Sequence, residues 1–392
     1  MIPLNPDTFN VDQDIGQALT LPPQAFTDPT ILARELETVF SSSWLLAPEP
    51  VPTASENTIR SLCEEVAEPL SYAPFQLCDH PLYLHRDEGG ELRCFPNVCT
   101  HAWYPLVTEA GCGKALTCGQ HGRRFDCRGQ FLSQPSFTDM PDFPRTCDHL
   151  QEIPFREWNS LGFASIGTPR HSFDHVFAPI NESLCQMPLA DLERVMQPDE
   201  VRIVDGNWKQ HAWNFMDKFH IPFIHRGPNG LVDALDYRTY QTELYDHAAL
   251  QWAWAKNPEH GFDPEHLPER FRDTSGQGRR VIALWWFVFP NLTLNFYPWG
   301  LSINRYEPIK SEPTKTRFYW HHYAMDKSKY EACESIWQNS KVDDEDVVAM
   351  GLVRRGLQSG LAPRGRFAPT EEMGPHWFHR TVYEHLFDAT ER

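Results

Sequence analysis

Two short stretches of the chain combine cysteine with histidine at close spacing. The first is Cys99-Thr100-His101, and the second, which follows after sixteen residues, is Cys118-Gly119-Gln120-His121. Each histidine follows its cysteine by two or three residues, so a thiolate and an imidazole can reach neighbouring metal ions without straining the backbone. We refer to these stretches as the Cys–His motifs and treat them as candidate metal ligands.

Two cysteines and two histidines in this pattern fit a Rieske [2Fe–2S] centre. In such a centre two cysteines, here Cys99 and Cys118, hold one iron, and two histidines, here His101 and His121, hold the other. A Cys2His2 zinc site is the alternative. Zinc sites usually begin with a C-x2–4-C pair, which the C-x-H motif does not match. The sequence therefore favours the Rieske centre over zinc.

A second candidate metal site follows in the segment from Asn207 to His225. Asp217 and His220 are three residues apart and share a helical face. His220 and His225 are five apart, which is about 140° of rotation on a straight helix, so both could not face one metal. We expect Pro222 to kink or end the helix and let both imidazoles converge. Taken alone, both histidines are equally explained as core or surface residues.

Two histidines and one distant carboxylate form the facial triad of non-haem Fe(II) oxygenases, which leaves positions open for O2. The acidic segment Val342–Val348 offers Asp343, Asp344, Glu345 and Asp346 at the expected start of a helix. Acidic residues in a first helical turn also serve the cap and the helix dipole, so this segment has a structural explanation as well.

The D-x-x-H-x-P-x-x-H segment, about one hundred residues after the Cys–His motifs, resembles the iron motif of the Rieske non-haem iron oxygenase α subunits. The lead-in Asn207-Trp208-Lys209 is also similar to that family. The resemblance covers roughly residues 30–392 and is closest to the choline-, carnitine- and betaine-type monooxygenases. Further support comes from Phe289–Pro298 and from Trp377-Phe378-His379-Arg380. The chain departs from the family pattern at Ala102, where arginine is usual, and at Arg123, where tryptophan is usual.

The resemblance implies a set of roles and partners. His220, His225 and Asp346 are implied as iron ligands, with Asp343 and Asp344 as alternatives to Asp346. Asp217 matches a carboxylate that bridges this iron to the Rieske histidine of a neighbouring subunit, and Asn214 is implied as a further catalytic residue. A homotrimer follows from that bridge. NAD(P)H electrons are expected to arrive through a separate flavin and iron–sulfur reductase.

Composition and strand patterns predict an α+β protein. We expect an N-terminal helix over 1–40 that packs on the catalytic domain, a small antiparallel β Rieske domain over 41–165, and a catalytic domain over 166–392. The resemblance implies a helix-grip (START-like) fold with a central antiparallel sheet for the last. Helices are predicted over 172–198, 207–220 and 344–358, and a surface loop or lid over 256–278. A stripe through Trp208, Ala212, Phe215 and Phe219 is predicted to be core.

The net charge of −18 disfavours nucleic acid and anionic membranes as partners. The longest apolar run, Val281–Pro290, is about half of what a membrane span needs. The N-terminal residues have neither a basic nor an apolar region typical of an export signal, and ten cysteines are too few for a disulfide scaffold. We therefore expect a cytoplasmic protein.

Aromatic residues make up 13 % of the chain. Those in the second domain could enclose a quaternary ammonium group by cation–π attraction, although any one of them is also explained as core. The named candidates are Trp285, Phe289 and Phe296. We expect hydroxylation or oxidative N-demethylation of a small quaternary ammonium or betaine-like compound. The alternatives are an arene or aryl-ether hydroxylase of the same family, and a Rieske electron-transfer protein without a functional second iron.

Overall fold

The structure is a computed structural model, and it describes residues 4–48, 61–138, 140–195, 200–226, 231–337 and 339–387. The chain divides into two units. The smaller unit spans Phe40–Arg170, and the larger unit combines Met1–Val39 with His171–Arg392. The boundary between Arg170 and His171 lies a few residues after residue 165, where the sequence patterns change. The two units are described separately below.

In its described residues the smaller unit forms short antiparallel strands in three sheets. One sheet has the order β4-β3-β2-β5, the second β6-β7-β8 and the third β1-β10-β9. Their bounds are β1 Leu45–Leu46, β2 Ser71–Leu77, β3 His80–Arg86, β4 Leu92–Pro96, β5 Gly111–Cys112, β6 Ala115–Thr117, β7 Arg124–Asp126, β8 Phe131–Ser133, β9 Phe155–Trp158 and β10 Leu161–Ala164. A short helix, α4 (Leu62–Glu65), precedes β2. This antiparallel β architecture confirms the predicted fold class of this part of the chain.

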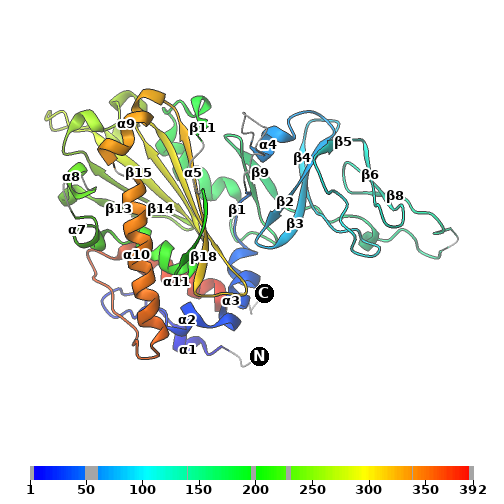
Figure 1. Cartoon of the computed structure of the whole chain (residues 1–392), viewed down its shortest axis with the longest axis horizontal. Coiled ribbons are helices and arrows are strands. Elements are labelled where there is room, and N and C mark those ends of the chain that lie inside the picture. Colours follow the sequence, from blue (N-terminus) through cyan, green and yellow to red (C-terminus); the bar gives the residue numbers. More distant parts are fainter. Residues whose placement is uncertain are drawn as a thin grey trace. The chain divides into compact units, whose positions relative to one another are not determined.

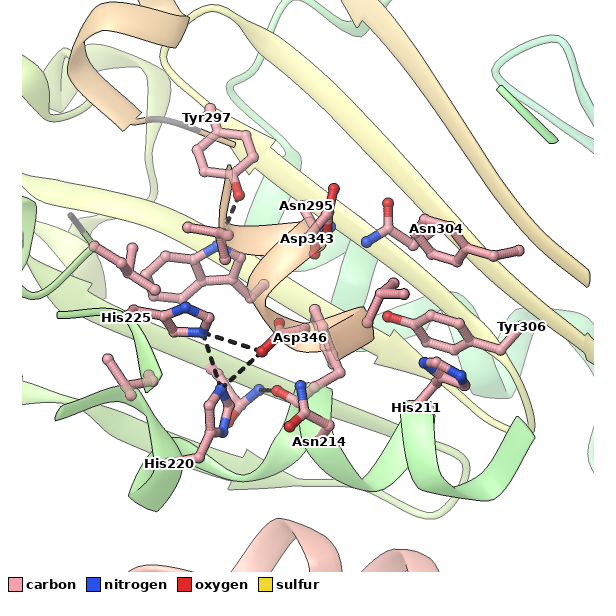
Figure 2. Close-up of a pocket in the computed structure, with 18 of the residues that line it drawn as sticks. His211, Asn214, His220, His225, Asn295, Tyr297, Asn304, Tyr306, Asp343 and Asp346 are labelled. Carbon is pink, nitrogen blue, oxygen red and sulfur yellow. Dashed lines mark hydrogen bonds and ion pairs between the residues drawn. The ribbon is translucent and has the colours of Figure 1, made fainter. Parts of the chain in front are cut away.

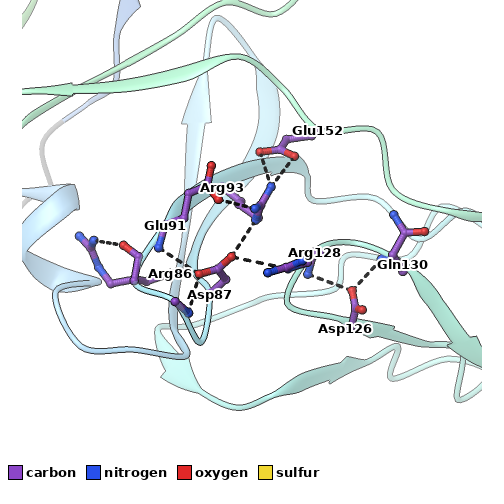
Figure 3. Close-up of polar contacts among 10 residues, drawn as sticks. Arg86, Asp87, Glu91, Arg93, Asp126, Arg128, Gln130 and Glu152 are labelled. Atoms are coloured by element: carbon purple, nitrogen blue, oxygen red, sulfur yellow. Dashed lines mark hydrogen bonds and ion pairs between the residues drawn. The ribbon is translucent and has the colours of Figure 1, made fainter.

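The turn between β3 and β4 is held by a buried carboxylate, Asp87 (Figure 3). Its Oδ1 accepts hydrogen bonds from the N–H groups of Gly89 and Glu91, at 2.8 and 3.0 Å. Arg93 Nε donates to its Oδ2 at 3.1 Å, and the same guanidinium reaches Glu152 at 2.9 Å. Burial alone would raise the pKa of Asp87, but these hydrogen bonds and the Arg93 charge lower it. The turn joins β3 and β4 as an antiparallel hairpin.

The larger unit is built on an antiparallel sheet (Figure 1). In the described part of the chain it has eight strands in the order β11-β18-β17-β16-β15-β14-β13, with β12 also paired to β18. Their bounds are β11 Glu193–Val195, β12 Val201–Asp205, β13 Gln241–Leu244, β14 Ala248–Trp254, β15 Val281–Val288, β16 Leu292–Tyr297, β17 Gly300–Pro308 and β18 Lys315–Ala324. Every residue of β15, β16 and β17 is buried, because helices and loops cover both faces.

Successive residues of β15 contact helices on opposite faces of the sheet. On one face Trp286 Nε1 donates to Ser183 Oγ of α5 (Phe173–Leu184) at 3.1 Å. On the other face Phe287 packs edge-on against Phe378 of α11 (Met373–Phe387), with ring centroids 5.7 Å apart. Strand residues alternate between faces, so neighbouring side chains serve different helices. The long helix α10 (Asn339–Gln358) follows α9 (Lys327–Trp337) and runs alongside the sheet in Figure 1.

The N-terminal segment belongs to the larger unit. It forms α1 (Pro6–Phe9), α2 (Gln24–Thr27) and α3 (Pro29–Glu35), and α3 continues as a π-helical turn over Leu36–Phe40. Glu35 is fully buried and lies 2.7 Å from Lys209 Nζ, and Trp208 Nε1 donates to the same carboxylate at 2.8 Å. A buried ion pair with an added donor satisfies both charges and ties this segment to α6 (Trp208–Met216).

The segment 256–278 is a largely exposed loop, as predicted, with three short 3₁₀ turns. Its Phe262, Leu267 and Phe271 are buried and anchor it to the core.

Two local predictions are corrected. The helix expected over 172–198 ends at Leu184, and Glu193–Val195 instead forms edge strand β11. Phe219 is 43 % exposed, because α6 stops before the core stripe reaches it. Among the described helices none is long and apolar enough to cross a membrane.

Candidate metal centres and substrate pocket

The two Cys–His motifs form loops with the same backbone hydrogen bonds. In each loop the cysteine N–H donates to the carbonyl oxygen five residues later, at 2.8 Å for both Cys99 and Cys118. The fourth residue after the cysteine returns an N–H bond to the cysteine carbonyl at 3.0 Å. That residue has a left-handed backbone in both loops, with φ of 62° at Trp103 and 71° at Gly122. Loop geometry therefore orients the two motifs alike.

The two candidate cysteines of the smaller unit lie together, and so do its two candidate histidines. Cys99 and Cys118 are 1 % and 2 % exposed, and neither forms a disulfide. Burial is the main cause that raises the pKa of the Cys99 thiol, and the neighbouring Cys118 thiol raises it further. The rings of His101 and His121 lie edge to face with centroids 4.8 Å apart. A pair of buried thiols and a pair of imidazoles, linked through the two short motifs, fit the donor set of a Rieske cluster, whose iron ions favour thiolates.

Arg123, one of the departures from the family pattern, is a buried structural residue. Its guanidinium donates to Thr100 Oγ1 at 2.8 Å and lies 3.2 Å from Asp148 Oδ1, and its Nε donates to Gln134 Oε1. Three phenylalanine rings surround it with centroids 5.3 to 5.7 Å from Cζ: Phe131, Phe137 and Phe143. Arg123 therefore ties the first Cys–His motif to the second, with its own charge compensated by Asp148.

In the larger unit the break between the two candidate histidines begins earlier than predicted. Helix α6 ends at Met216, and Asp217 caps the following 3₁₀ turn (Lys218–His220) by accepting the Phe219 N–H at 2.8 Å. The next helical turn, α7 (Ile221–Ile224), contains Pro222 in its first turn, where no helical hydrogen bond is lost. The Asp217 turn, and not a proline kink, therefore redirects the chain so that both histidines converge.

His220, His225 and Asp346 converge on one point (Figure 2). His220 Nε2 lies 3.1 Å from His225 Nε2, and Asp346 Oδ1 lies 3.5 and 3.2 Å from these two atoms. A first-row metal ion at about 2.1 Å from each ligand would hold adjacent ligands about 3 Å apart. The three donor atoms therefore fit a metal ion of the facial-triad type.

Charges around the triad already favour a cation. Burial opposes protonation of His220, but the Asp217 and Asp346 carboxylates outweigh it and raise the pKa of His220 to about 9. Burial would raise the pKa of Asp346, yet its contacts with His220 and His225 hold it well below its usual range. A metal ion that enters must displace the proton of His220.

Two further carboxylates lie near Nδ1 of the histidines, the ring nitrogen that does not point at the triad centre. Glu345 Oε2 lies 2.9 Å from Nδ1 of His225, which is 1 % exposed. This hydrogen bond directs the other ring nitrogen of His225 towards Asp346. Asp217 Oδ2 lies 3.7 Å from His220 Nδ1, an ion-pair distance longer than a hydrogen bond. Asp344 points elsewhere and pairs with Arg202 at 3.0 Å.

A pocket opens beside the triad between α6, α10 and the sheet. Asn214 and Trp285, both predicted site residues, line it. Asp343, an alternative iron ligand in the sequence analysis, and Tyr297 line it too. Further lining residues missed from the sequence are His211, Gln251, Asn295, Asn304 and Tyr306. The strand pairing brings Gln251, Trp285 and Asn295 into one row across β14, β15 and β16, and a row of this kind has no sequence signal before the register is known.

Two predicted substrate residues lie away from this pocket. Phe296 pairs with Leu284 in the sheet, so it faces the opposite side from Trp285. Phe289 lies on the same side as Trp285 but further along the chain, where it packs against Phe378 and His385. The structure therefore does not bring Phe289 or Phe296 to the triad. Trp285 is the candidate that it does bring there, and Asn295 and Tyr297 flank it.

Comparison with known proteins gives the family. Residues 62–144 match the model of the Rieske [2Fe-2S] domain, and residues 189–387 match that of the ring hydroxylating alpha subunit (catalytic domain), which is half of the chain. The chain belongs to the ring-hydroxylating α-subunit family. It is thus a Rieske non-haem iron oxygenase, with a [2Fe–2S] cluster, a mononuclear iron and electrons from a separate reductase.

Relatives of different kinds match this oxygenase. It is 24 % identical over 400 residues to the chloroplastic choline monooxygenase of Arabidopsis thaliana, covering 96 % of this chain and 85 % of the relative. The α subunit of toluate 1,2-dioxygenase from Pseudomonas putida is 25 % identical over 213 residues, which cover 52 % and 43 % of the two chains. Among solved structures, the quaternary ammonium Rieske monooxygenase CntA shares the fold, with TM-score 0.71, 18 % identity and coverage of 97 % and 98 %.

Proposed function

We propose that this oxygenase hydroxylates a small quaternary ammonium compound that also carries a hydroxyl group, as choline does. The observation that carries the proposal is the chemistry of the pocket beside the triad. Its described lining residues combine aromatic rings with carbonyl and carboxylate oxygens and include neither lysine nor arginine. Such a lining suits a cation and offers an anion no lysine or arginine to pair with.

Aromatic faces for the ammonium group come from the stacked pair Tyr240 and Trp285 and from the neighbouring Tyr297. Trp285 stacks on Tyr240 at 5.7 Å between ring centroids with 9° between the planes, and its Nε1 donates to the Tyr297 hydroxyl at 3.1 Å. This contact uses the indole N–H, and the ring face remains a favourable surface for a methylated cation. Electrostatic attraction between a quaternary ammonium and such rings contributes about 1–2 kcal/mol when water is excluded.

Hydrogen-bond acceptors flank these rings. Gln251 Nε2 donates to the Phe215 carbonyl oxygen, which orients its amide, and Asn295 Nδ2 donates to Thr293 Oγ1. The amide oxygens of Gln251, Asn295 and Asn304 are buried and accept no hydrogen bond from the described residues. Buried acceptors of this kind need a donor. A substrate hydroxyl can supply one, which distinguishes a choline-like substrate from a simple tetraalkylammonium.

The same lining weighs against the other substrate classes. A betaine or carnitine carboxylate in this pocket would lie near Asp343 and Asp346 without a lysine or arginine to pair with. A flat arene would leave the three amide oxygens without donors in an apolar environment. The match to choline monooxygenase over almost the whole chain, against half of the chain for toluate dioxygenase, supports a quaternary ammonium compound over an arene.

The proposed roles follow from the contacts. Cys99, Cys118, His101 and His121 hold the [2Fe–2S] cluster, and His220, His225 and Asp346 hold the mononuclear iron. When bound, that iron supplies O2 activation for C–H hydroxylation. Glu345 fixes the orientation of the His225 ring, and the pocket aromatic residues position the ammonium group. If an N-methyl carbon is hydroxylated, the product collapses to formaldehyde and the tertiary amine.

We also propose that the protein is a homotrimer and that it is located in the cytoplasm. Asp217 is the bridge to the Rieske histidine of a neighbouring copy in a homotrimer. Exposed apolar side chains beside the triad support such an interface, since Phe219, Phe223 and Ile224 are 43 %, 56 % and 36 % exposed. Trp103, which follows the first Cys–His motif, is 81 % exposed. The nine described cysteines form no disulfide, which supports a reducing compartment such as the cytoplasm.

A single-turnover experiment tests the proposal without the cognate reductase. The iron-loaded protein is reduced chemically and mixed with O2 and either choline, tetramethylammonium, glycine betaine or toluene. We expect product and reoxidation of the cluster with choline, and much less with the other three compounds. Hydroxylated toluene as the main product would favour the arene hydroxylase instead. His220→Ala should keep the cluster but give no product, whereas an electron-transfer protein would show no product in either form.

A further inference from the structure

We propose that His171, His175 and Asp246 form a second site for a divalent transition-metal ion, distinct from both iron centres. Each residue offers one ligand atom, and these atoms all lie within 4.8 Å of one another. We call these three residues the peripheral site. They share no residue and no helix with the His220–His225–Asp346 triad, so the inference does not depend on the proposed substrate.

The start of α5 positions the two histidines. Ser172 is the N-cap residue, and its Oγ accepts the His175 N–H at 3.2 Å. His171 precedes the cap and His175 lies in the first turn, four residues later. Their rings stack with centroids 5.1 Å apart and 16° between the planes. Two stacked imidazolium ions would repel each other, whereas two neutral imidazoles can share a cation as ligands.

Asp246 approaches from a different element. It lies in the turn between β13 and β14, which Tyr245 N closes by donating to Ala248 O at 2.8 Å. Its Oδ2 is 2.7 Å from His175 Nε2, although 71 residues separate the two in sequence. The sheet and α5 therefore bring a carboxylate to a histidine pair that the helix has already aligned.

A buried histidine supports the peripheral site from the inside. The His247 ring, which is 6 % exposed, packs edge-on against His171 with centroids 4.3 Å apart. On its other side His247 packs against His385 of α11 at 5.0 Å. His171 thus packs against a buried side chain, while His175 and Asp246 are more than half exposed. Water can complete the coordination of an ion bound there.

The donor set selects the class of ion. Two imidazoles and one carboxylate suit zinc, copper and nickel better than magnesium or calcium, which prefer oxygen ligands. Zinc accepts three protein ligands and a water in tetrahedral geometry. A simple ion pair needs only His175 and Asp246, whereas a metal site uses the ring nitrogens of both histidines. The contribution of His171 therefore separates a metal site from an ion pair.

The experiment measures zinc on the iron-loaded full-length protein. The protein is dialysed against micromolar Zn²⁺, and zinc and iron are quantified together by elemental analysis. We expect about one zinc per chain with unchanged iron, and a rise of about 5 °C in the unfolding temperature at hundredfold excess of zinc over Kd. His171→Ala, His175→Ala and Asp246→Asn should each lose this zinc and the rise.

Two controls make the result decisive. His266→Ala removes a histidine outside the peripheral site and should bind zinc as the unchanged protein does. Iron content in His175→Ala should equal that of the unchanged protein, which shows that the triad is intact. The proposal is overturned if zinc uptake is absent, if His171→Ala binds zinc as well as the unchanged protein, or if zinc enters only as iron is lost.

Discussion

Asp346 Oδ1 lies 3.2 Å from His225 Nε2, although the two residues come from helical segments far apart in the sequence. The acidic residues lie inside α10 (Asn339–Gln358), at least one turn after its first described residue, whereas the sequence predicted them at the start of a helix over 344–358. Asp346 then faces the two histidines, Asp344 faces Arg202, and Asp343 lines the pocket.

Glu345→Gln should weaken binding of the mononuclear iron. The carboxylate at 2.9 Å from His225 Nδ1 orients the ring and strengthens its other nitrogen as a ligand. We expect iron affinity to fall by about 10- to 100-fold, measured by iron content after dialysis against a chelator. Asp344→Asn, one residue away but paired with Arg202, is the matched control and should keep its iron. Equal iron loss in both variants would contradict the orienting role.

Asp217→Asn should slow turnover while leaving both metal centres loaded. The amide can still accept the Phe219 N–H, so the local turn is kept, but the charge beside His220 is removed. Reductase-driven turnover is expected to fall by about 10- to 100-fold with iron content unchanged. Asp236→Asn changes an aspartate that caps the 3₁₀ turn Tyr237–Thr239 in the same way and should be nearly silent. Normal turnover in Asp217→Asn would refute the bridging role.

Asn295→Leu should raise the KM for a hydroxylated ammonium substrate. The variant replaces a buried amide acceptor in the pocket by an apolar side chain of similar size. Loss of one hydrogen bond corresponds to about a tenfold increase in KM for choline. Tetramethylammonium has no hydroxyl group and binds poorly to the unchanged protein. Its KM should therefore stay the same in Asn295→Leu. A similar change for both compounds would indicate a distorted pocket instead of a lost acceptor.

Glu35→Gln should destabilise the larger unit by about 3 kcal/mol, because it leaves the buried Lys209 ammonium without its counter-charge. Chemical denaturation followed by circular dichroism measures the change in the free energy of unfolding. The control variant Glu37→Gln changes an exposed glutamate two residues further along the chain. It should alter the free energy of unfolding by less than about 0.5 kcal/mol. If the two variants are equally stable, the Glu35–Lys209 pair is not a stabilising contact.

Acid should destabilise the fold through His379. Burial, aided by the Lys209 charge, lowers the pKa of His379 to about 3, and its Nδ1 accepts the Leu21 N–H at 3.0 Å. The unfolded chain binds a proton near pH 6.5 that the folded chain refuses, so stability is lost as the pH falls from about 6.5 towards 3. The glutamine of His379→Gln cannot titrate. When the pH falls from 7.5 to 5, the free energy of unfolding of this variant should therefore decrease by about 2 kcal/mol less than that of the unchanged protein. Parallel losses in urea denaturation at the two pH values would rule out this residue as the cause.

Chemistry that depends on short spacing was predictable from the sequence alone. Cysteine and histidine two or three residues apart can serve one metal centre whatever surrounds them, and the histidines of the second centre lie within six residues of each other. For the same reason the hairpin at Asp87 and the antiparallel character of the strands were predictable. Each of these depends on local backbone geometry that the neighbouring residues impose.

Contacts between side chains far apart in the sequence were not predictable in this way. The packing of α10 turns Asp346, among three aspartates, towards the histidines, and strand register places Asn295 beside Trp285 while it turns Phe296 to the other face. The contacts of Glu345 with His225 and of His175 with Asp246 have no sequence signal, because 120 and 71 residues separate the partners. A shift of one residue in a strand, or of one turn in a helix, would exchange these neighbours, and only long-range packing fixes both.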